Sequence, residues 1–182
     1  MAQKATIFKV TLHIADMDRQ YYADHPLTIA RHPSETDERM MIRLLAFALN
    51  ASDALEFTKG LSTDDEPELW AKTLTNDIDL WVELGLPDED RLRKACNRSE
   101  QVILYTYGGR AVPVWWEKHH SKLARFGNLQ VIDLPSEQTI ELADMVQRSM
   151  DLQINIQDGE VTITDGQAIR TLTPVQKLPA ED

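Results

Sequence analysis

Apolar and polar residues alternate at the start of the chain and predict a β-hairpin. Apolar side chains occupy every second position from Phe8 to Ile14, which is the period of a strand with one buried face. A turn at residues 16–18 follows, and a returning strand runs from Arg19 to Ile29 with an interruption at His25-Pro26. We therefore expect a pair of antiparallel strands at the N-terminus.

A helical period replaces this alternation after residue 34. Ser34 is expected to cap the helix, and Asp37 is expected to lie in its first turn, where an acid is favoured. The helix is expected to run to about Asn50. Its apolar stripe on one face consists of Met41, Leu44, Leu45 and Ala48.

The rest of the pattern predicts a mixed sheet with helices packed on it. After a surface loop at 58–66, the elements are a hairpin at 69–85, a helix at 88–99, a strand at 101–107, a helix at 113–124, a strand at 129–134, a helix at 136–150 and a hairpin turning at Asp158-Gly159. Alternation of strand and helix from 78 to 134 implies parallel pairing in the middle, and the hairpins imply antiparallel edges. We expect an α/β fold, a mixed sheet with flanking helices and extra β-hairpins, in a single domain over residues 1–182.

The hairpin at 69–85 has a register that the apolar pattern selects. A turn at residues 75 and 76 gives cross-strand partners whose numbers sum to 151. The pairs on one face are then Glu68 with Glu83, Trp70 with Trp81 and Lys72 with Asp79. The other face is apolar and consists of Leu69, Ala71, Leu80 and Val82. A three-residue loop at 75–77 would mix the two faces and is disfavoured, and both tryptophans are expected to pack rather than to stack on a ligand.

The paired carboxylates of this hairpin have two interpretations. Like charges that face each other across a sheet are destabilising by roughly a few tenths to 1 kcal/mol. A hydrated sheet edge tolerates that cost, and Glu68 and Glu83 would then be part of a solvated face. A divalent cation between the two carboxylates would turn the same pair into a metal site, because Mg²⁺ prefers oxygen ligands.

Charge is distributed unevenly along the chain. The net charge of -11 disfavours contact with phosphates, but residues 91–131 are basic. The cations of this stretch are Arg91, Arg93, Lys94, Arg98, Arg110, Lys118, Lys122 and Arg125. Interleaved aromatic residues are Tyr105, Tyr107, Trp115, Trp116 and Phe126. The stretch is typical either of a surface that follows a phosphate backbone or of ordinary strands and helices with solvated charges.

Composition excludes several classes of protein. Hydrophobic residues make up 42% and charged residues 27%, which is ordinary for a folded soluble chain. No stretch approaches the roughly 20 apolar residues of a membrane-spanning helix, and the N-terminus lacks the apolar core of a secretory signal. A lone cysteine, Cys96, excludes an intramolecular disulfide, so we expect a cytoplasmic protein. The sequence also lacks a G-x-S-x-G motif, a glycine-rich phosphate-binding loop and a Cys/His cluster, and no organic cofactor is expected.

Several strings of residues resemble a known family. The strings are EPELW, DLWVELGLPDEDRLRKAC, VILYTYGGRAVPVWW and RHPSETDERMMIRLLAFAL. They resemble the YaeQ family of bacterial proteins, and the resemblance extends over nearly the whole chain. That family is similar to nucleases of the PD-(D/E)XK fold, whose core is a helix, a hairpin bearing metal-binding carboxylates, and then a helix and further strands. The resemblance therefore implies a PD-(D/E)XK nuclease-like core.

The residues carry this resemblance unevenly. Glu68 matches the first acid of the motif, with Glu in place of Asp, and Glu83 matches the second acid. Gly85 stands where the motif has a lysine, so Lys94 on the next helix is the implied substitute. Glu38 occupies the place of an additional acid in such folds.

Two functions follow from the resemblance. The first is Mg²⁺- or Mn²⁺-dependent hydrolysis of phosphodiester bonds in nucleic acid, with the metal held by Glu68 and Glu83. The second is a nuclease-like fold without catalysis that serves binding or regulation, which the displaced lysine and the acidic total favour. The expected catalytic residues are Glu38, Glu68, Glu83 and Lys94, and the expected nucleic-acid contacts are Arg91, Arg98 and Arg110.

Overall fold

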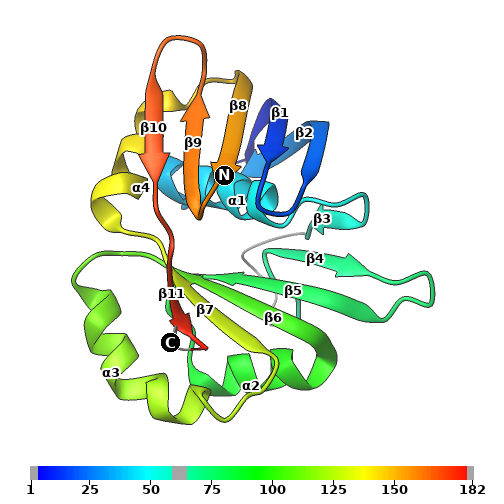
Figure 1. Ribbon diagram of the computed structural model, residues 1–182, viewed down its shortest axis with the longest axis vertical. Helices are drawn as coiled ribbons and strands as arrows, with labels where there is room; N and C mark the ends of the chain where they lie inside the picture. The colour runs from blue at the N-terminus through cyan, green and yellow to red at the C-terminus, as the bar shows by residue number, and fades with distance from the viewer. Residues whose placement is uncertain (1–3, 59–64, 180–182) are drawn as a thin grey trace. The chain divides into compact units, whose positions relative to one another are not determined.

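The computed structural model describes residues 4–58 and 65–179, and the chain folds as two compact units (Figure 1). Unit 1 comprises Met1–Leu49 and Glu137–Pro174, and unit 2 comprises Asn50–Ser136 and Val175–Asp182. Each unit has its own sheet, so the expected mixed α/β fold is confirmed, but the expectation of one sheet is wrong. The single domain stays a prediction, and most of the predicted loop at 58–66 lies outside the described residues.

Unit 1 is built on a sheet with the strand order β10-β9-β8-β1-β2. The strands are β1 (Thr6–Asp16), β2 (Tyr21–Arg31), β8 (Ser149–Gln157), β9 (Glu160–Thr164) and β10 (Ile169–Leu172). β1 and β8 are parallel, and the other neighbouring pairs are antiparallel. Both predicted terminal hairpins are confirmed. Pro26 lies within β2, and the position suits it because an edge strand tolerates a missing N–H.

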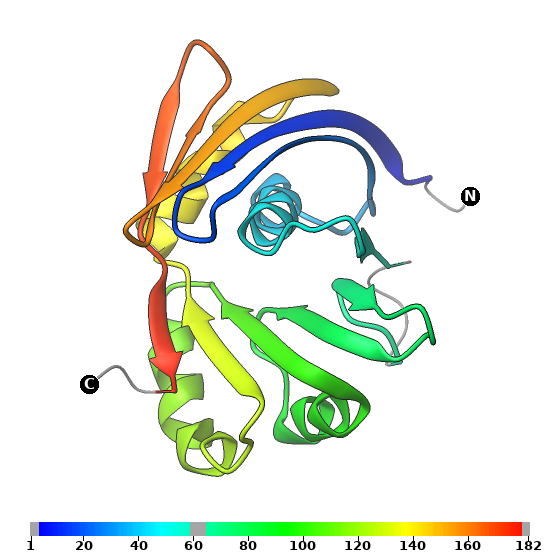
Figure 2. The same cartoon turned by 45° about the vertical axis from the view of Figure 1, so that its right-hand side comes forward.

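The helices of unit 1 are α1 (Asp37–Leu49) and α4 (Ser136–Leu142), and a 3₁₀ turn at Ala143–Met145 follows α4. Figure 2 shows β1 and β2 curving over α1. Thr36, not Ser34, caps α1, because the Thr36 hydroxyl accepts a bond from the Arg39 N–H at 3.1 Å. The predicted one-sided stripe is also wrong, since every residue from 40 to 48 is buried. The predicted helix at 136–150 already ends at Leu142.

Unit 2 is built on a second mixed sheet with the strand order β11-β7-β6-β5-β4-β3. The strands are β3 (Leu55–Phe57), β4 (Leu69–Lys72), β5 (Ile78–Leu84), β6 (Ser99–Thr106), β7 (Leu129–Asp133) and β11 (Val175–Leu178). The helices are α2 (Glu89–Arg98) and α3 (Ala111–Leu123). β5, β6 and β7 are parallel to one another, and the other pairs are antiparallel, which confirms the predicted parallel centre.

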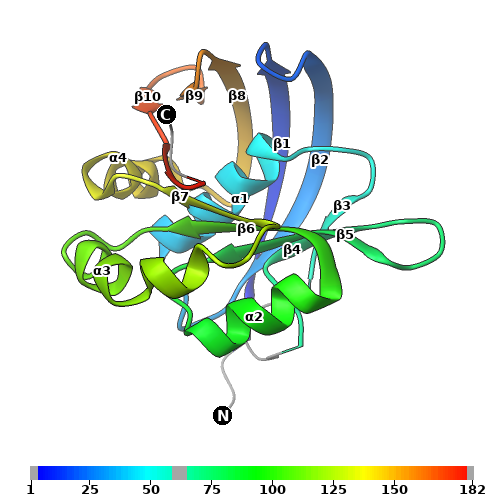
Figure 3. The same cartoon turned by 60° about the horizontal axis from the view of Figure 1, so that its bottom comes forward.

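α2 and α3 lie against the same face of this sheet (Figure 3). Asp88 begins α2 as its cap, and its carboxylate accepts a hydrogen bond from the Arg91 N–H at 2.8 Å. The core on this face contains Trp81, Leu92, Ala95, Val102, Leu104, Trp115, Leu123, Leu129 and Val131. The side chains of β5 on this face are therefore covered by α2 rather than exposed. No helix among the described residues is long and apolar enough to cross a membrane.

Candidate functional site

The β4–β5 hairpin has the predicted register over most of its length. Trp70 pairs with Trp81, and the adjacent pairs also have numbers that sum to 151. An irregularity then places Lys72 opposite Ile78, so the predicted pairing of Lys72 with Asp79 is wrong. Glu68 lies just before β4, where its N–H donates to the Val82 carbonyl at 3.0 Å. The two acids thus lie near each other, but Glu68 is outside the ladder that was expected to set it opposite Glu83.

Glu83 is buried, with only 4% of its surface exposed. Its two carboxylate oxygens accept bonds from Arg91 Nε and Arg91 Nη2, each at 2.8 Å, and one of them also accepts from Trp81 Nε1 at 3.0 Å. Burial raises the pKa of Glu83, the bonds from Arg91 and Trp81 act in the opposite direction, and the charge of Glu68 adds to the rise. The interpretation of this carboxylate as part of a solvated face is therefore wrong.

Arg91 binds one of the two carboxylates to which the resemblance assigns a metal ion. Its guanidinium contacts both oxygens of Glu83, and Nη2 also donates to the Glu66 carbonyl at 2.9 Å. A divalent cation bound to Glu83 would have to replace this two-point contact, so the side chains as arranged do not fit a resident Mg²⁺. In the part of the chain that the structure describes, no group of three or more His, Cys, Asp or Glu is placed to hold a metal ion.

A cleft of about 180 Å³ lies along α2. It is lined by Asp65, Trp81, Arg91, Lys94, Ala95, Asn97 and Arg98. Arg98 is held there by two contacts, because its guanidinium carbon lies 5.2 Å from the Trp81 ring centroid and its Nη1 donates to the Asp65 carbonyl at 2.7 Å. The Lys94 side chain is exposed and makes no hydrogen bond or ion pair with any residue that the structure describes.

The structure brings some of the predicted residues together and leaves others apart. Arg91, Lys94 and Arg98 share the cleft, as their helical spacing predicts. Arg110 is exposed before α3 and does not line the cleft. Glu38 belongs to α1 of unit 1, where it accepts a hydrogen bond from the Thr139 hydroxyl at 2.9 Å. Its participation in the hairpin site stays a prediction.

The basic stretch 91–131 does not form the aromatic surface that its sequence favours. Tyr105 and Trp115 are buried, and Trp116 and Phe126 pack against the core. The aromatic side chains beside the cations of the cleft come instead from the hairpin, where Trp70 and Trp81 meet edge to face with ring centroids 6.5 Å apart. The alternative interpretation, strands and helices with solvated charges, describes most of this stretch.

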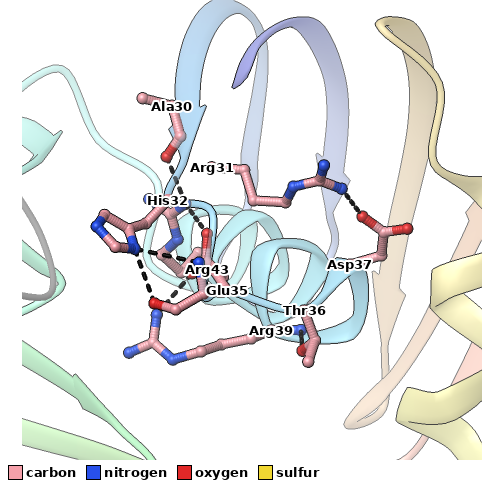
Figure 4. Close-up of polar contacts among 9 residues, drawn as sticks. Ala30, Arg31, His32, Glu35, Thr36, Asp37, Arg39 and Arg43 are labelled. Atoms are coloured by element: carbon pink, nitrogen blue, oxygen red, sulfur yellow. Dashed lines mark hydrogen bonds and ion pairs between the residues drawn. The ribbon is translucent and has the colours of Figure 1, made fainter. Parts of the chain in front are cut away.

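A second buried carboxylate was missed by the sequence analysis. The Glu35 side chain, in unit 1, is fully buried and is paired with Arg39 and Arg43 of α1 (Figure 4). Arg43 also donates to the Ala30 carbonyl at 2.9 Å, which ties α1 to the end of β2. Arg39 and Arg43 share one face of α1 because they are four residues apart, and an acid at position 35 just before the helix is a signal that could have identified this cluster.

Comparisons with known proteins identify a family and solved structures with the same fold. Residues 1–174 match the family described as YaeQ protein. Proteins named "Uncharacterized protein YaeQ" from Salmonella typhi and Escherichia coli (strain K12) are each 50% identical over 165 residues, which is 91% of this chain and 91% of each relative. The crystal structure of YaeQ protein from Xanthomonas axonopodis pv. citri is 54% identical, with a TM-score of 0.93 over 95% of this chain and 98% of that chain. The crystal structure of YaeQ protein from Pseudomonas syringae is 36% identical, with a TM-score of 0.91 over 97% of each chain.

Proposed function

The chain belongs to the YaeQ family, and from its cleft along α2 we propose that this protein binds nucleic acid through the phosphate backbone. The observation that carries the proposal is the convergence of Lys94 and Arg98 on one cleft. Lys94 supplies an exposed ammonium, and Arg98 supplies a guanidinium fixed by Trp81 and by a backbone carbonyl. Cations of this kind contact phosphate oxygens and dominate the affinity for nucleic acid.

Arg91 and Glu83 have a positioning role in this proposal. The buried carboxylate neutralises Arg91 and fixes it as one wall of the cleft. A bidentate arginine–carboxylate pair restricts the guanidinium more strongly than a single bond would. Phosphate contacts are thereby assigned to Lys94 and Arg98, while Arg91 shapes the wall against which they lie.

A metal-dependent phosphodiester hydrolase remains the second candidate function. The proximity of two acids supports it, because Glu68 is held by a backbone bond to Val82, the neighbour of Glu83, and divalent cations take carboxylate oxygens. The element order β4, β5, α2, β6 supports the PD-(D/E)XK-like core that this candidate requires. It also requires Arg91 to leave Glu83. Calorimetric titration with Mn²⁺ separates the two candidates, because only the hydrolase predicts a binding heat that Glu83→Gln abolishes.

The binding proposal is tested with a fluorescently labelled oligonucleotide and anisotropy measurements over a range of KCl concentrations. Each phosphate contact to a single strand contributes about 0.7 to the slope of log affinity against log salt concentration. Lys94→Gln and Arg98→Gln are each expected to weaken binding and to reduce the slope by about that amount.

Arg93→Gln is the matched control for this experiment. Arg93 lies on the same helix and carries the same charge, but it pairs with Glu89 and Asp90 and does not line the cleft. Equal losses for the Arg93 and Arg98 variants would show a general charge effect and would contradict a binding site in the cleft. An absence of oligonucleotide binding by the unmodified protein would contradict the proposal as a whole.

A further inference from the structure

Two adjacent tryptophans of the hairpin in unit 2 are flanked by a cationic side chain at each end, and this row leads to the cleft. The Lys72 ammonium lies 4.0 Å from the Trp70 ring centroid, Trp70 meets the Trp81 ring at an interplanar angle of 71°, and Arg98 lies over Trp81. These four residues are called the cation–aromatic ladder below. Trp81 belongs both to the ladder and to the lining of the cleft, so the two features adjoin.

The hairpin register produces this ladder. Trp70 and Trp81 are direct cross-strand partners, and such aromatic pairs pack side by side on one face of a sheet. The irregularity between Ala71 and Lys72 changes the cross-strand partner of Lys72, and the Lys72 side chain lies over the Trp70 ring. Arg98, in the last turn of α2, covers the buried partner.

The two tryptophans differ in their access to a ligand. Trp81 is only 2% exposed and is part of the core. Trp70 is half-buried, and its Nε1 donates to Glu56 Oε1 at 3.1 Å, which fixes the orientation of the indole. A lysine ammonium on a flexible side chain covers one face of this ring. A planar ligand can displace that ammonium and keep the orientation of the indole unchanged.

We propose that Trp70 is a stacking platform for an unpaired base and that single-stranded nucleic acid is the ligand of the adjoining cleft. This inference rests on the proposed function, because it assigns the base to Trp70 and the phosphates to Lys94 and Arg98. Aromatic side chains beside a cationic groove are the usual means of holding single strands, since every base offers a π-face. The displaced Lys72 ammonium becomes available to a phosphate of the same strand.

The preference for single strands follows from the geometry of stacking. In a duplex both faces of a base are covered by its neighbours, so a duplex can offer its phosphates to the cleft but no base to Trp70. The platform therefore adds affinity for single strands alone. The sequence pattern alone favours packing for both tryptophans, and the structure retains that role for Trp81.

The test compares a labelled thymidine oligonucleotide with a duplex of the same length by anisotropy. Trp70→Ala is expected to weaken single-strand binding roughly tenfold and to leave duplex binding unchanged. Trp70→Phe is expected to retain most of the affinity, because phenylalanine keeps an aromatic face, and it should remove most of the quenching of tryptophan emission on binding. Trp116→Phe, in α3 outside the ladder, is the matched control and should keep both signals.

The possible outcomes separate the inference from the proposed function. Unchanged single-strand affinity in Trp70→Ala, together with a loss in Arg98→Gln, would overturn the platform and leave phosphate binding in place. Equal losses for single strand and duplex in Trp70→Ala would also overturn it. Absence of any oligonucleotide binding by the unmodified protein would overturn both. A selective loss in the alanine variant with retention in the phenylalanine variant supports the platform, even if alanine lowers stability.

Discussion

Each unit buries one glutamate against arginine, and the two clusters differ in what lies beside them. In unit 1 the Glu35 side chain has no exposed surface, and Arg43, one of its two partners, is 8% exposed. In unit 2 the Glu83 side chain is 5% exposed, but its partner Arg91 is 26% exposed and lines a cleft. The ionic chemistry is the same in both clusters.

This comparison shows that a buried ion pair alone does not mark a functional site. Burying a charged pair is costly, and removing one partner of such a pair is costlier still, so either cluster would be retained for structural reasons alone. The Glu83 cluster differs from the Glu35 cluster in two respects: water reaches its arginine, and the exposed cation of Lys94 lies near it. Lys94 lines the cleft together with Arg91, the partner of Glu83, whereas Glu35, which precedes α1, is enclosed by two arginines of that helix.

The largest expected effect comes from breaking the enclosed cluster. Glu35→Gln leaves Arg43 buried without its carboxylate, and we expect the free energy of unfolding to fall by about 3–5 kcal/mol. Guanidinium denaturation measures this loss. Glu160→Gln, an exposed position on β9 of the same unit, is the control and should be within about 0.5 kcal/mol of the unmodified protein. A similar small effect for both variants would show that the Glu35 cluster contributes little.

A smaller loss of stability is expected in the cluster beside the cleft. In Glu83→Gln, water reaches part of the Arg91 guanidinium and offsets its lost partner, so we expect about 1–3 kcal/mol of destabilisation. The measurement is the same denaturation experiment, with Glu100→Gln on β6 as the exposed control. If Glu83→Gln lowered the free energy of unfolding as much as Glu35→Gln does, solvent access to the arginine would not reduce the cost of losing its carboxylate.

The smallest effect is expected from an exposed ionic cluster in unit 1, and it depends on pH. His13 lies between Asp24 and Asp151, with Nδ1 2.8 Å and Nε2 2.9 Å from their carboxylates. The hydrogen bond with Asp24 raises the pKa of His13, and Asp151 adds to the rise. The stabilisation is therefore complete below the ordinary histidine pKa of 6.5 and is lost as the pH rises through the higher pKa of the folded state.

Denaturation midpoints at several pH values test this dependence on His13. The difference in stability between the unmodified protein and His13→Gln should be greatest at the acidic end of the range and should shrink as the pH rises. In an Asp24→Asn background, the stability difference caused by His13→Gln should also be smaller, because the partner that raises the pKa of His13 most is gone. A difference that stays constant with pH would contradict the assignment.

The sequence could predict the hairpin register but not what covers each of its faces. Alternation between Leu69 and Ala71 on one side and Trp70 on the other determines the pairing, because a slip of one residue would expose the apolar face. It does not reveal that α2 packs on the Trp81 and Glu83 side. The helix offers only Leu92 and Ala95 as buried residues, so its charged sequence resembles that of a solvated helix.

The choice between Arg91 and Lys94 also could not be made from spacing. Both residues lie on one stripe of α2, one turn apart, and either could approach the hairpin. The cap at Asp88 sets where the helix begins and so brings Arg91 to Glu83, leaving Lys94 at the exposed side of the cleft. The division into two sheets was missed for a related reason, because strand pairing over long separations is not encoded in local patterns.

The pairing of β1 with β8 has a consequence for the order in which the two units fold during synthesis. Lys9 and Ser149 pair in this ladder although they are far apart in the sequence. Strands β3 to β7 of unit 2, in contrast, come from one continuous stretch of sequence. During synthesis the β1 edge is therefore without its neighbour until the whole inserted stretch has left the ribosome. Closing so long a loop is slow, and an unpaired strand edge is prone to aggregate meanwhile. We expect most of unit 2 to become ordered first and unit 1, although it begins the chain, to be completed late.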